Sequence, residues 1–202
     1  MNLPFDHLNL RFNPFGELTS DQRKQVAFVD IESLTKSLNK EATAIQFLAD
    51  HGRGKTTHLL SLHDYYSKTE YIKIYQGDKP DFTEQFIRFV DSVENLTKKS
   101  RLELYKKTSS IAFTSHADLS KELHKAGFSV TTIKVCMENE LTLRDIFTQR
   151  IKFAQRNDGA IPVVDQFAIK KLKTLYGDDI RSMEGHLYEL FQQMERIENV
   201  KV

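Results

Sequence analysis

The chain has 202 residues, of which 40% are hydrophobic and 28% charged, a composition typical of a globular protein with one proper core. Its 29 basic and 28 acidic side chains leave a net charge of +1, so overall charge indicates neither nucleic acid nor a membrane as partner. No apolar run approaches the about 20 residues that cross a bilayer, and the single cysteine, Cys136, excludes an internal disulfide and a four-cysteine metal site. The N-terminal stretch MNLPFDHLNLRFNPFG lacks the basic-then-apolar order of a signal peptide, so we expect a cytoplasmic protein.

Most of the chain predicts strands that alternate with helices. Pro14, Gly16 and aromatic residues predict that the segment LNLRFNPFGELTSDQ at 8–22 is extended or turning, with Leu10, Phe12 and Phe15 docked on the body. Ser20 is a candidate cap for a helix through about 28. Five runs then have the length and composition of strands: 42–49, 70–76, 86–91, 109–115 and 129–136. Helical segments are predicted at 31–40, 56–66, 93–107 and 117–127. This alternation predicts an α/β fold with a five-stranded, mainly parallel sheet flanked by helices.

After Cys136 the strand signals stop, and three helices are predicted near 140–156, 163–176 and 179–198. The last of them places apolar residues along one face: Ile180, Met183, Leu187, Leu190, Met194 and Ile197. We therefore expect two domains, an α/β domain over 1–136 and a small all-helical domain over 137–202.

The stretch IQFLADHGRGKTTHLL at 45–60 predicts a phosphate-binding loop between a strand and a helix. Gly54, Lys55 and Thr56 match the second half of the pattern GxxxxGK[ST], whereas Ala49 stands where the pattern has its first glycine. In such a loop backbone N–H groups surround the phosphates, lysine supplies a point charge and a hydroxyl reaches a magnesium ion. The predicted binding residues are Ala49, Gly52, Arg53, Gly54, Lys55, Thr56 and Thr57.

A second acidic residue at the end of a neighbouring strand is expected to hold Mg²⁺ through water. The strand FIRFVD ends in Asp91, which we assign to the metal together with Thr56. Many hydrolases follow this aspartate with a glutamate that activates water, but Ser92 stands there and serine is no general base at neutral pH. Either Glu94 acts from an altered position, or hydrolysis is slow or absent.

With these motifs the chain resembles the AAA+ superfamily of P-loop ATPases, in particular the bacterial general-secretion and transposition-helper branch. The resemblance rests on the lead-in LNLRFNPFG, the glycine loop, the strand FIRFVD and the segment GDDIRSMEGHLYELF at 177–191. It implies ATP and Mg²⁺ as cofactors, a helical lid over 137–202 and a sensor-2 arginine, Arg181, that contacts the γ-phosphate. It also implies that Thr114 or Ser115, at the end of SSIAFTS, is the polar sensor-1 residue.

The chain departs from that family in three places. The link at 77–85 is short for a parallel crossover, the usual catalytic glutamate is replaced by Ser92, and no residue is an unambiguous arginine finger. Arg144, Arg150 and Arg156 are the candidates for that finger.

We interpret the chain as an ATP-binding P-loop NTPase whose nucleotide state controls contact with a protein or nucleic-acid partner. Lys55, Glu94 and Arg181 are its candidate catalytic residues, and oligomerisation stays open. Two alternatives stay open as well, a scaffold that binds nucleotide without hydrolysing it and a small-molecule or nucleoside kinase. The basic stretch at 98–107 is a candidate contact for nucleic-acid phosphates through Lys98, Lys99, Arg101, Lys106 and Lys107, although a solvated helix face explains it equally simply.

Overall fold

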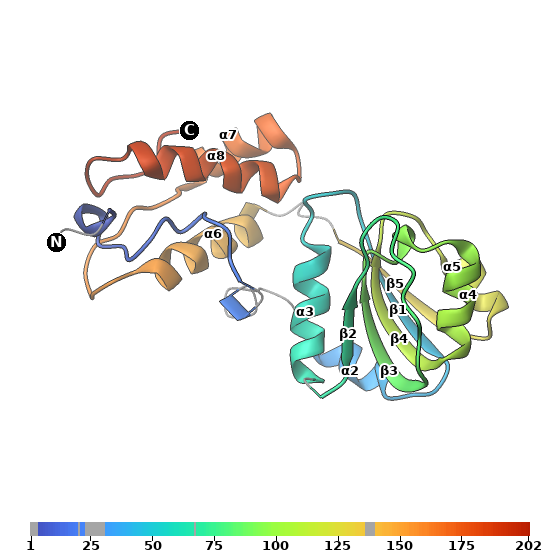
Figure 1. Ribbon diagram of the computed structural model, residues 1–202. Coiled ribbons are helices and arrows are strands. Elements are labelled where there is room, and N and C mark those ends of the chain that lie inside the picture. The colour runs from blue at the N-terminus through green and yellow to red at the C-terminus, as the bar shows by residue number, and fades with distance from the viewer. Residues whose placement is uncertain (1–3, 20, 23–30, 67, 136–139) are drawn as a thin grey trace. The chain divides into compact units, whose positions relative to one another are not determined.

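A computed structural model describes residues 4–19, 21–22, 31–66, 68–135 and 140–202 (Figure 1). By its internal contacts the chain divides into an α/β unit, residues 29–135, and a helical unit, residues 1–28 with 136–202. The division places the N-terminal segment with the C-terminal helices, whereas the sequence assigned it to the α/β domain. The helix predicted from Ser20 to residue 28 and the domain boundary at 136–137 fall outside the described residues.

The α/β unit is built on one sheet in which every strand runs parallel to its neighbours, in the order β2-β3-β4-β1-β5. The strands are β1 Thr43–Leu48, β2 Glu70–Lys73, β3 Gln85–Asp91, β4 Thr108–Ser115 and β5 Ser129–Lys134. The predicted fold class is confirmed. Because helices cover both faces, β1, β3 and β4 are nearly continuous runs of buried residues, as expected for the centre of a parallel sheet.

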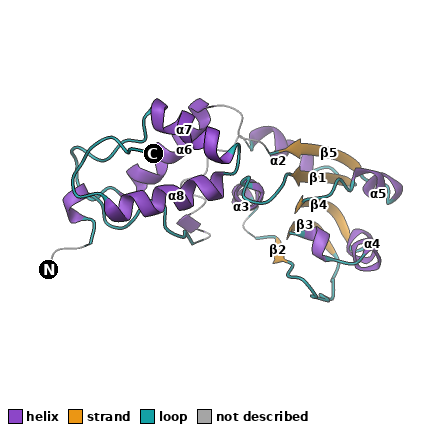
Figure 2. Cartoon of the chain, turned by 90° about the horizontal axis from the view of Figure 1, so that it is seen from above, coloured by secondary structure: helices purple, strands orange, loops and turns teal. Residues whose placement is uncertain are grey.

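Among the described residues, four helices flank this sheet: α2 Glu32–Leu38, α3 Lys55–Tyr65, α4 Lys98–Lys106 and α5 Ser120–Lys125 (Figure 2). Neighbouring residues of β1 point to opposite faces, so Ala44 packs in the cluster with Leu104 of α4 while Ile45 packs with Leu59 of α3. The sheet is thereby buried between α2 and α3 on one face and α4 and α5 on the other.

In the α/β unit, the helix predicted over 93–107 and the strand predicted over 70–76 differ in the structure. The helix predicted over 93–107 is divided into a 3₁₀ turn, η2 Val93–Asn95, and α4, because Leu96 is extended and Thr97 begins the next helix. The Thr97 hydroxyl accepts a hydrogen bond from the Ser100 N–H at 3.2 Å, which is an ordinary N-cap. The β2 strand ends at Lys73, and this lengthens the link to β3 enough for a parallel crossover without a helix.

The helical unit contains η1 Asp6–Leu8, α6 Glu140–Ala154, α7 Gln166–Tyr176 and α8 Ile180–Gln193. Its core includes Phe15, whose ring lies 5.7 Å from that of Phe147 on α6 and 5.2 Å from that of Phe191 on α8. The buried Arg150 guanidinium donates to the carbonyl oxygens of Pro14 and Gly16 at 2.7 and 2.8 Å. These contacts explain why the N-terminal segment belongs to this unit.

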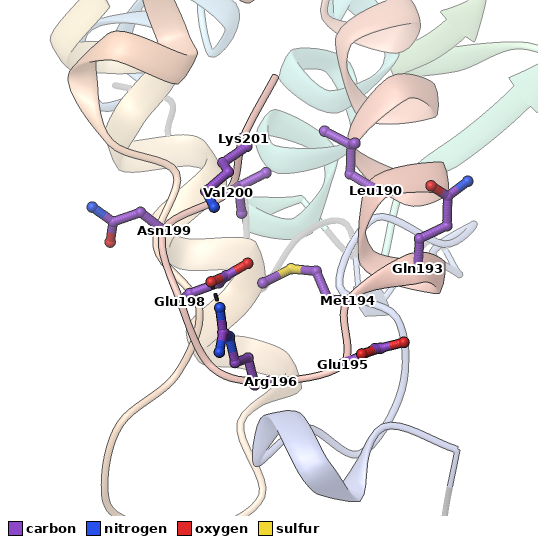
Figure 3. A pocket seen from close by; sticks show the side chains of 9 residues that line it. All are labelled: Leu190, Gln193, Met194, Glu195, Arg196, Glu198, Asn199, Val200 and Lys201. Atoms are coloured by element: carbon purple, nitrogen blue, oxygen red, sulfur yellow. Dashed lines mark hydrogen bonds and ion pairs between the residues drawn. The ribbon is translucent and has the colours of Figure 1, made fainter.

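The last helix is shorter than its periodicity predicts. It ends at Gln193 because Met194 is extended, and the chain then returns so that the Val200 N–H donates to the Val163 carbonyl at 2.9 Å. Ile197 is 39% exposed and lies outside the helical face, where Phe191 is buried instead. Side chains between 190 and 201 line a cleft of about 450 Å³ with mixed polar and apolar walls (Figure 3). In the described part of the chain no helix has the length and apolar character needed to cross a bilayer.

Candidate functional site

The predicted phosphate loop lies between β1 and α3, with its glycines in the conformation that such a loop requires. Gly52 and Gly54 have φ of 76° and 89°, values that residues with a Cβ adopt only at a cost, and Gly54 directly precedes α3. Ala49 has no such requirement, because its N–H donates to the Ser115 carbonyl at 3.4 Å and continues the β1–β4 ladder. An alanine at the first motif position is therefore compatible with the loop, whose N–H groups lie at the N-terminus of an 11-residue helix.

The Lys55 side chain folds back into this loop and is only 8% exposed. Its ammonium group donates to the carbonyl oxygens of Ala49 and Asp50, both at 2.7 Å, and lies 3.3 Å from Nδ1 of His116. A buried cation needs such acceptors. Arg53 lies in the same loop and Thr57 in the first turn of α3, both half-buried.

The buried carboxylate of Asp91, at the end of β3, contacts the hydroxyl groups of three other residues of the site. The Thr56 hydroxyl is 3.1 Å from one carboxylate oxygen, Thr114 donates to the same oxygen at 2.6 Å, and the Tyr71 hydroxyl lies 3.3 Å from the other. Thr114 also accepts a hydrogen bond from the Ser92 N–H at 2.7 Å. The structure thus brings together three residues predicted from separate segments and adds Tyr71, which the sequence did not indicate.

Thr114 and Ser115 were equal candidates in the sequence, and the structure gives them different surroundings. The Ser115 hydroxyl donates to the Ala117 carbonyl at 2.8 Å and accepts from the Ala117 N–H at 3.1 Å. It therefore shapes the turn after β4, while Thr114 is the hydroxyl that contacts Asp91.

Replacement of Thr114 by valine is expected to lower the free energy of unfolding by about 1–3 kcal/mol, because it leaves the Ser92 N–H without its acceptor and removes the shortest of the hydroxyl contacts to Asp91. Urea denaturation of Thr114→Val and Thr114→Ser measures this. The serine variant keeps the hydroxyl and should lie close to the wild type; equal loss in both variants would contradict the assignment.

Glu94 reaches the same site because the chain turns sharply after Asp91. Ser92 adopts a left-handed conformation, φ 63° and ψ 51°, and the 3₁₀ turn that follows directs the Glu94 carboxylate back toward the loop. One carboxylate oxygen lies 3.3 Å from Nε2 of His116, and the other is buried without a hydrogen-bond partner among the described residues. Burial raises the pKa of Glu94 and nearby Asp91 adds to the rise, whereas Lys55 and His51 oppose it. A half-buried carboxyl with a perturbed pKa beside a predicted phosphate loop is a candidate acid–base group.

His116 is, after Tyr71, a second residue of this site that the sequence did not indicate. It follows β4 directly, and because the carboxyl ends of parallel strands meet at one edge of a sheet, that position alone could have indicated it. Its ring lies 3.8 Å from that of His51, centroid to centroid, and burial together with the charges of Lys55 and His51 lowers the pKa of His116. The described residues contain no cluster of three or more histidine, cysteine or acidic side chains suited to a metal.

Comparison with solved structures decides the fold. A single-substitution variant of Thermotoga maritima RuvB, an AAA+ ATPase, superposes with a TM-score of 0.56 at 14% sequence identity, over 84% of this chain and 64% of that one. The chain has the fold of a P-loop NTPase. It spans less than two thirds of the RuvB chain it matches. Saccharomyces cerevisiae Rif2 aligns over 88% of this chain and 82% of its own at 11% identity, but its TM-score of 0.43 is too low to argue a shared fold. No known family model matches the chain, and no curated protein sequence does.

The predicted sensor-2 arginine and the candidate arginine fingers all lie in the helical unit. Arg181 is exposed in the first turn of α8, and its contact with a γ-phosphate stays a prediction. Among the candidate fingers, Arg150 is bound to the N-terminal segment and Arg156 pairs with Asp6, so both have structural roles within the unit. Arg144 is half-exposed on α6, beside Asp145 at 3.6 Å.

The predicted basic surface on α4 is smaller than its sequence indicates. Arg101 donates from Nε and Nη2 to the Glu122 carboxylate at 2.8 and 2.9 Å, and from Nη1 to the Leu96 carbonyl at 2.8 Å. Lys107 lies 3.5 Å from the Glu84 carboxylate. Arg101 therefore ties α4 to α5, and Lys98, Lys99 and Lys106 are the exposed cations of this helix.

Proposed function

We propose that the α/β unit binds ATP with Mg²⁺ at the loop between β1 and α3. The observation that carries this proposal is the 3.1 Å contact between the Thr56 hydroxyl and the Asp91 carboxylate. Thr56 directly follows the buried Lys55 on α3. Lys55 binds the outer phosphates, and the N–H groups of 52–56 surround them at the helix N-terminus. ATP is proposed as the nucleotide from the resemblance to AAA+ ATPases, and the lack of an Asn-Lys-x-Asp guanine signature argues against GTP only by absence.

The donor set fits magnesium. A hydroxyl and a carboxylate are hard oxygen ligands of the kind that Mg²⁺ takes beside phosphate oxygens, and Thr56 and Asp91 offer both at one point. Thr56 would bind the ion directly and Asp91 through water. When bound, the ion neutralises charge on the terminal phosphates.

Glu94 is the proposed base for hydrolysis, since Ser92 cannot take that role. Its carboxylate accepts the proton of the water that attacks the γ-phosphate, and the products are ADP and inorganic phosphate. Lys55 and Arg181 stabilise the negative charge that develops on the transferred group, and Thr114 orients the terminal phosphate. One buried oxygen of Glu94 has no partner among the described residues, which supports this assignment, because a polar atom kept in that state is costly without a ligand.

The nucleotide state is proposed to control contact with a protein or nucleic-acid partner, with residues 137–202 as the lid and Arg181 as its sensor of the γ-phosphate. The general-secretion and transposition-helper branch of AAA+ ATPases is the proposed relationship. A scaffold that binds ATP without turnover is the second candidate, favoured by Ser92 at the usual glutamate position.

A titration with and without metal tests the proposed site. Wild-type protein should bind ATP about tenfold or more tightly in Mg²⁺ than in EDTA, in keeping with the free energy of charge-assisted ligand contacts. Thr56→Val removes the proposed ligand and should abolish most of that gain, while Thr56→Ser should retain it. Equal ATP affinity with and without Mg²⁺ in the wild type would contradict the metal assignment.

A further inference from the structure

One imidazole ring connects the phosphate-binding lysine with the carboxylate proposed as the base. Nδ1 of His116 lies 3.3 Å from Nζ of Lys55, and Nε2 of the same ring lies 3.3 Å from the Glu94 carboxylate. The three side chains come from α3, the end of β4 and the turn after β3, so the sheet edge brings them together. The ring of His51 also packs against this connection, at 3.8 Å from the ring of His116.

The chemistry of the two neighbours determines which nitrogen of His116 carries the proton. An ammonium group only donates hydrogen bonds, so Nδ1 facing Lys55 must be an acceptor. A neutral imidazole with an unprotonated Nδ1 carries its hydrogen on Nε2, from which it donates to the Glu94 carboxylate. Burial, Lys55 and His51 lower the pKa of His116 and outweigh the Ala49 carbonyl and Asp50, which raise it, so the neutral form is favoured over a cation that would repel Lys55.

We propose that His116 is a positioning residue that couples phosphate binding at Lys55 to the orientation of Glu94. This inference rests on the proposed function. Lys55 has three N–H donors, and its contacts include two loop carbonyls and His116. Phosphate oxygens compete for the same donors, so a nucleotide draws Lys55 away from Nδ1 of His116.

Movement of Lys55 changes the hydrogen bond between His116 and Glu94. While Lys55 holds Nδ1, the ring is fixed and its Nε2–H keeps one Glu94 oxygen occupied. Once Lys55 leaves, the ring is free to turn or to move its hydrogen to Nδ1, and Glu94 is released for a water molecule. Glu94 would thereby become available as a base only while the phosphates of a nucleotide occupy the loop.

The resting contacts are testable without any nucleotide. Long-range ¹H–¹⁵N correlation spectra of protein labelled with ¹⁵N-histidine report the tautomer of each ring, and His116→Asn assigns the signal. We expect the Nε2–H tautomer for His116 in the wild type and a changed Nδ1 signal in Lys55→Met. His124 on α5 is an internal control, because its Nδ1 lies 3.1 Å from the Phe128 carbonyl, away from the site. Its Nδ1 signal should not change. A protonated ring, an Nδ1–H tautomer or an Nδ1 signal unaffected by Lys55→Met would overturn the proposal.

The coupling is tested by adding Mg²⁺ with the β,γ-imido analogue of ATP, with binding measured calorimetrically on the same sample. We expect the Nδ1 signal of His116 to move on binding. If the analogue binds and the Nδ1 signal of His116 stays unchanged, the coupling is overturned and the proposed function stands; if nothing binds to folded protein, both fail.

In turnover assays His116→Asn should change kcat about fivefold or more with KM within about twofold, since residues in contact commonly couple by such amounts. Equal effects on both constants would indicate a merely structural role.

Discussion

Replacement of Glu94 by glutamine is expected to lower the rate of ATP hydrolysis about a hundredfold to ten-thousandfold, the range that a positioned general base contributes. The amide keeps the shape of the side chain and still accepts a hydrogen bond from His116, but it cannot take a proton from water. Binding of Mg²⁺–ATP should stay within about threefold of the wild type, because the phosphate contacts of Lys55 are untouched. Phosphate release at saturating Mg²⁺–ATP, with and without candidate partners, measures the change.

Glu103→Gln is the matched control, since Glu103 is exposed on α4 and lies outside the site. It should hydrolyse ATP as the wild type does. Unchanged turnover in Glu94→Gln would remove Glu94 from the role of base. A wild type whose turnover stays negligible with every partner would favour the nucleotide-dependent scaffold instead.

Replacement of Arg88 by methionine is expected to lower the free energy of unfolding by about 2–4 kcal/mol, because the hydrogen bonds of a fully buried guanidinium are lost together. Arg88 is fully buried on β3, and its guanidinium donates to Glu70 at 2.6 Å, to the Thr83 carbonyl at 2.7 Å and to the Thr108 hydroxyl at 3.2 Å. It also lies 5.3 Å from the ring of Phe82 in the β2–β3 link. Methionine fills part of the volume but takes the donor from all three acceptors, of which the Thr108 hydroxyl belongs to a buried residue.

Urea denaturation measures this loss, and two further variants locate its source. Glu70 is 37% exposed, so Glu70→Gln should cost only about 1 kcal/mol. Arg88→Lys keeps the charge but not the planar fork, and should fall between the two. If the free energy of unfolding of Arg88→Met lay within about 1 kcal/mol of the wild-type value, the contacts of Arg88 would not be what holds β2 and its link against β3.

Local sequence patterns were sufficient for the sheet and for half of the candidate site. Apolar runs of strand length between helical segments predicted five strands, and all five are present with a parallel arrangement. The loop residues could be found because glycine, lysine and threonine are needed in a fixed order along the chain. Asp91 could be paired with Thr56 because it ends a strand, and the ends of parallel strands meet.

The features that the sequence did not predict depend on contacts between distant residues. Nothing local indicates that Phe15 packs against Phe147 and Phe191, which moves the N-terminal segment into the helical unit. No glycine or proline at the end of α8 signals that the helix stops at Gln193. The chain stops there and returns so that Val200 pairs with Val163, a contact between distant residues. His116 lacked a motif, since its role arises only where β4 ends beside the loop.

Calorimetric titration of Mg²⁺–ATP into the wild type and into Lys55→Ala tests the central claim most directly. The account predicts saturable binding to the wild type and affinity reduced about a hundredfold or more in the variant, because a buried ammonium loses its charge-assisted contacts to the phosphates. Circular dichroism of both proteins, recorded at the same temperature, establishes that each is folded. A folded wild type that does not bind Mg²⁺–ATP, or a Lys55→Ala variant that binds it equally well, would contradict the account.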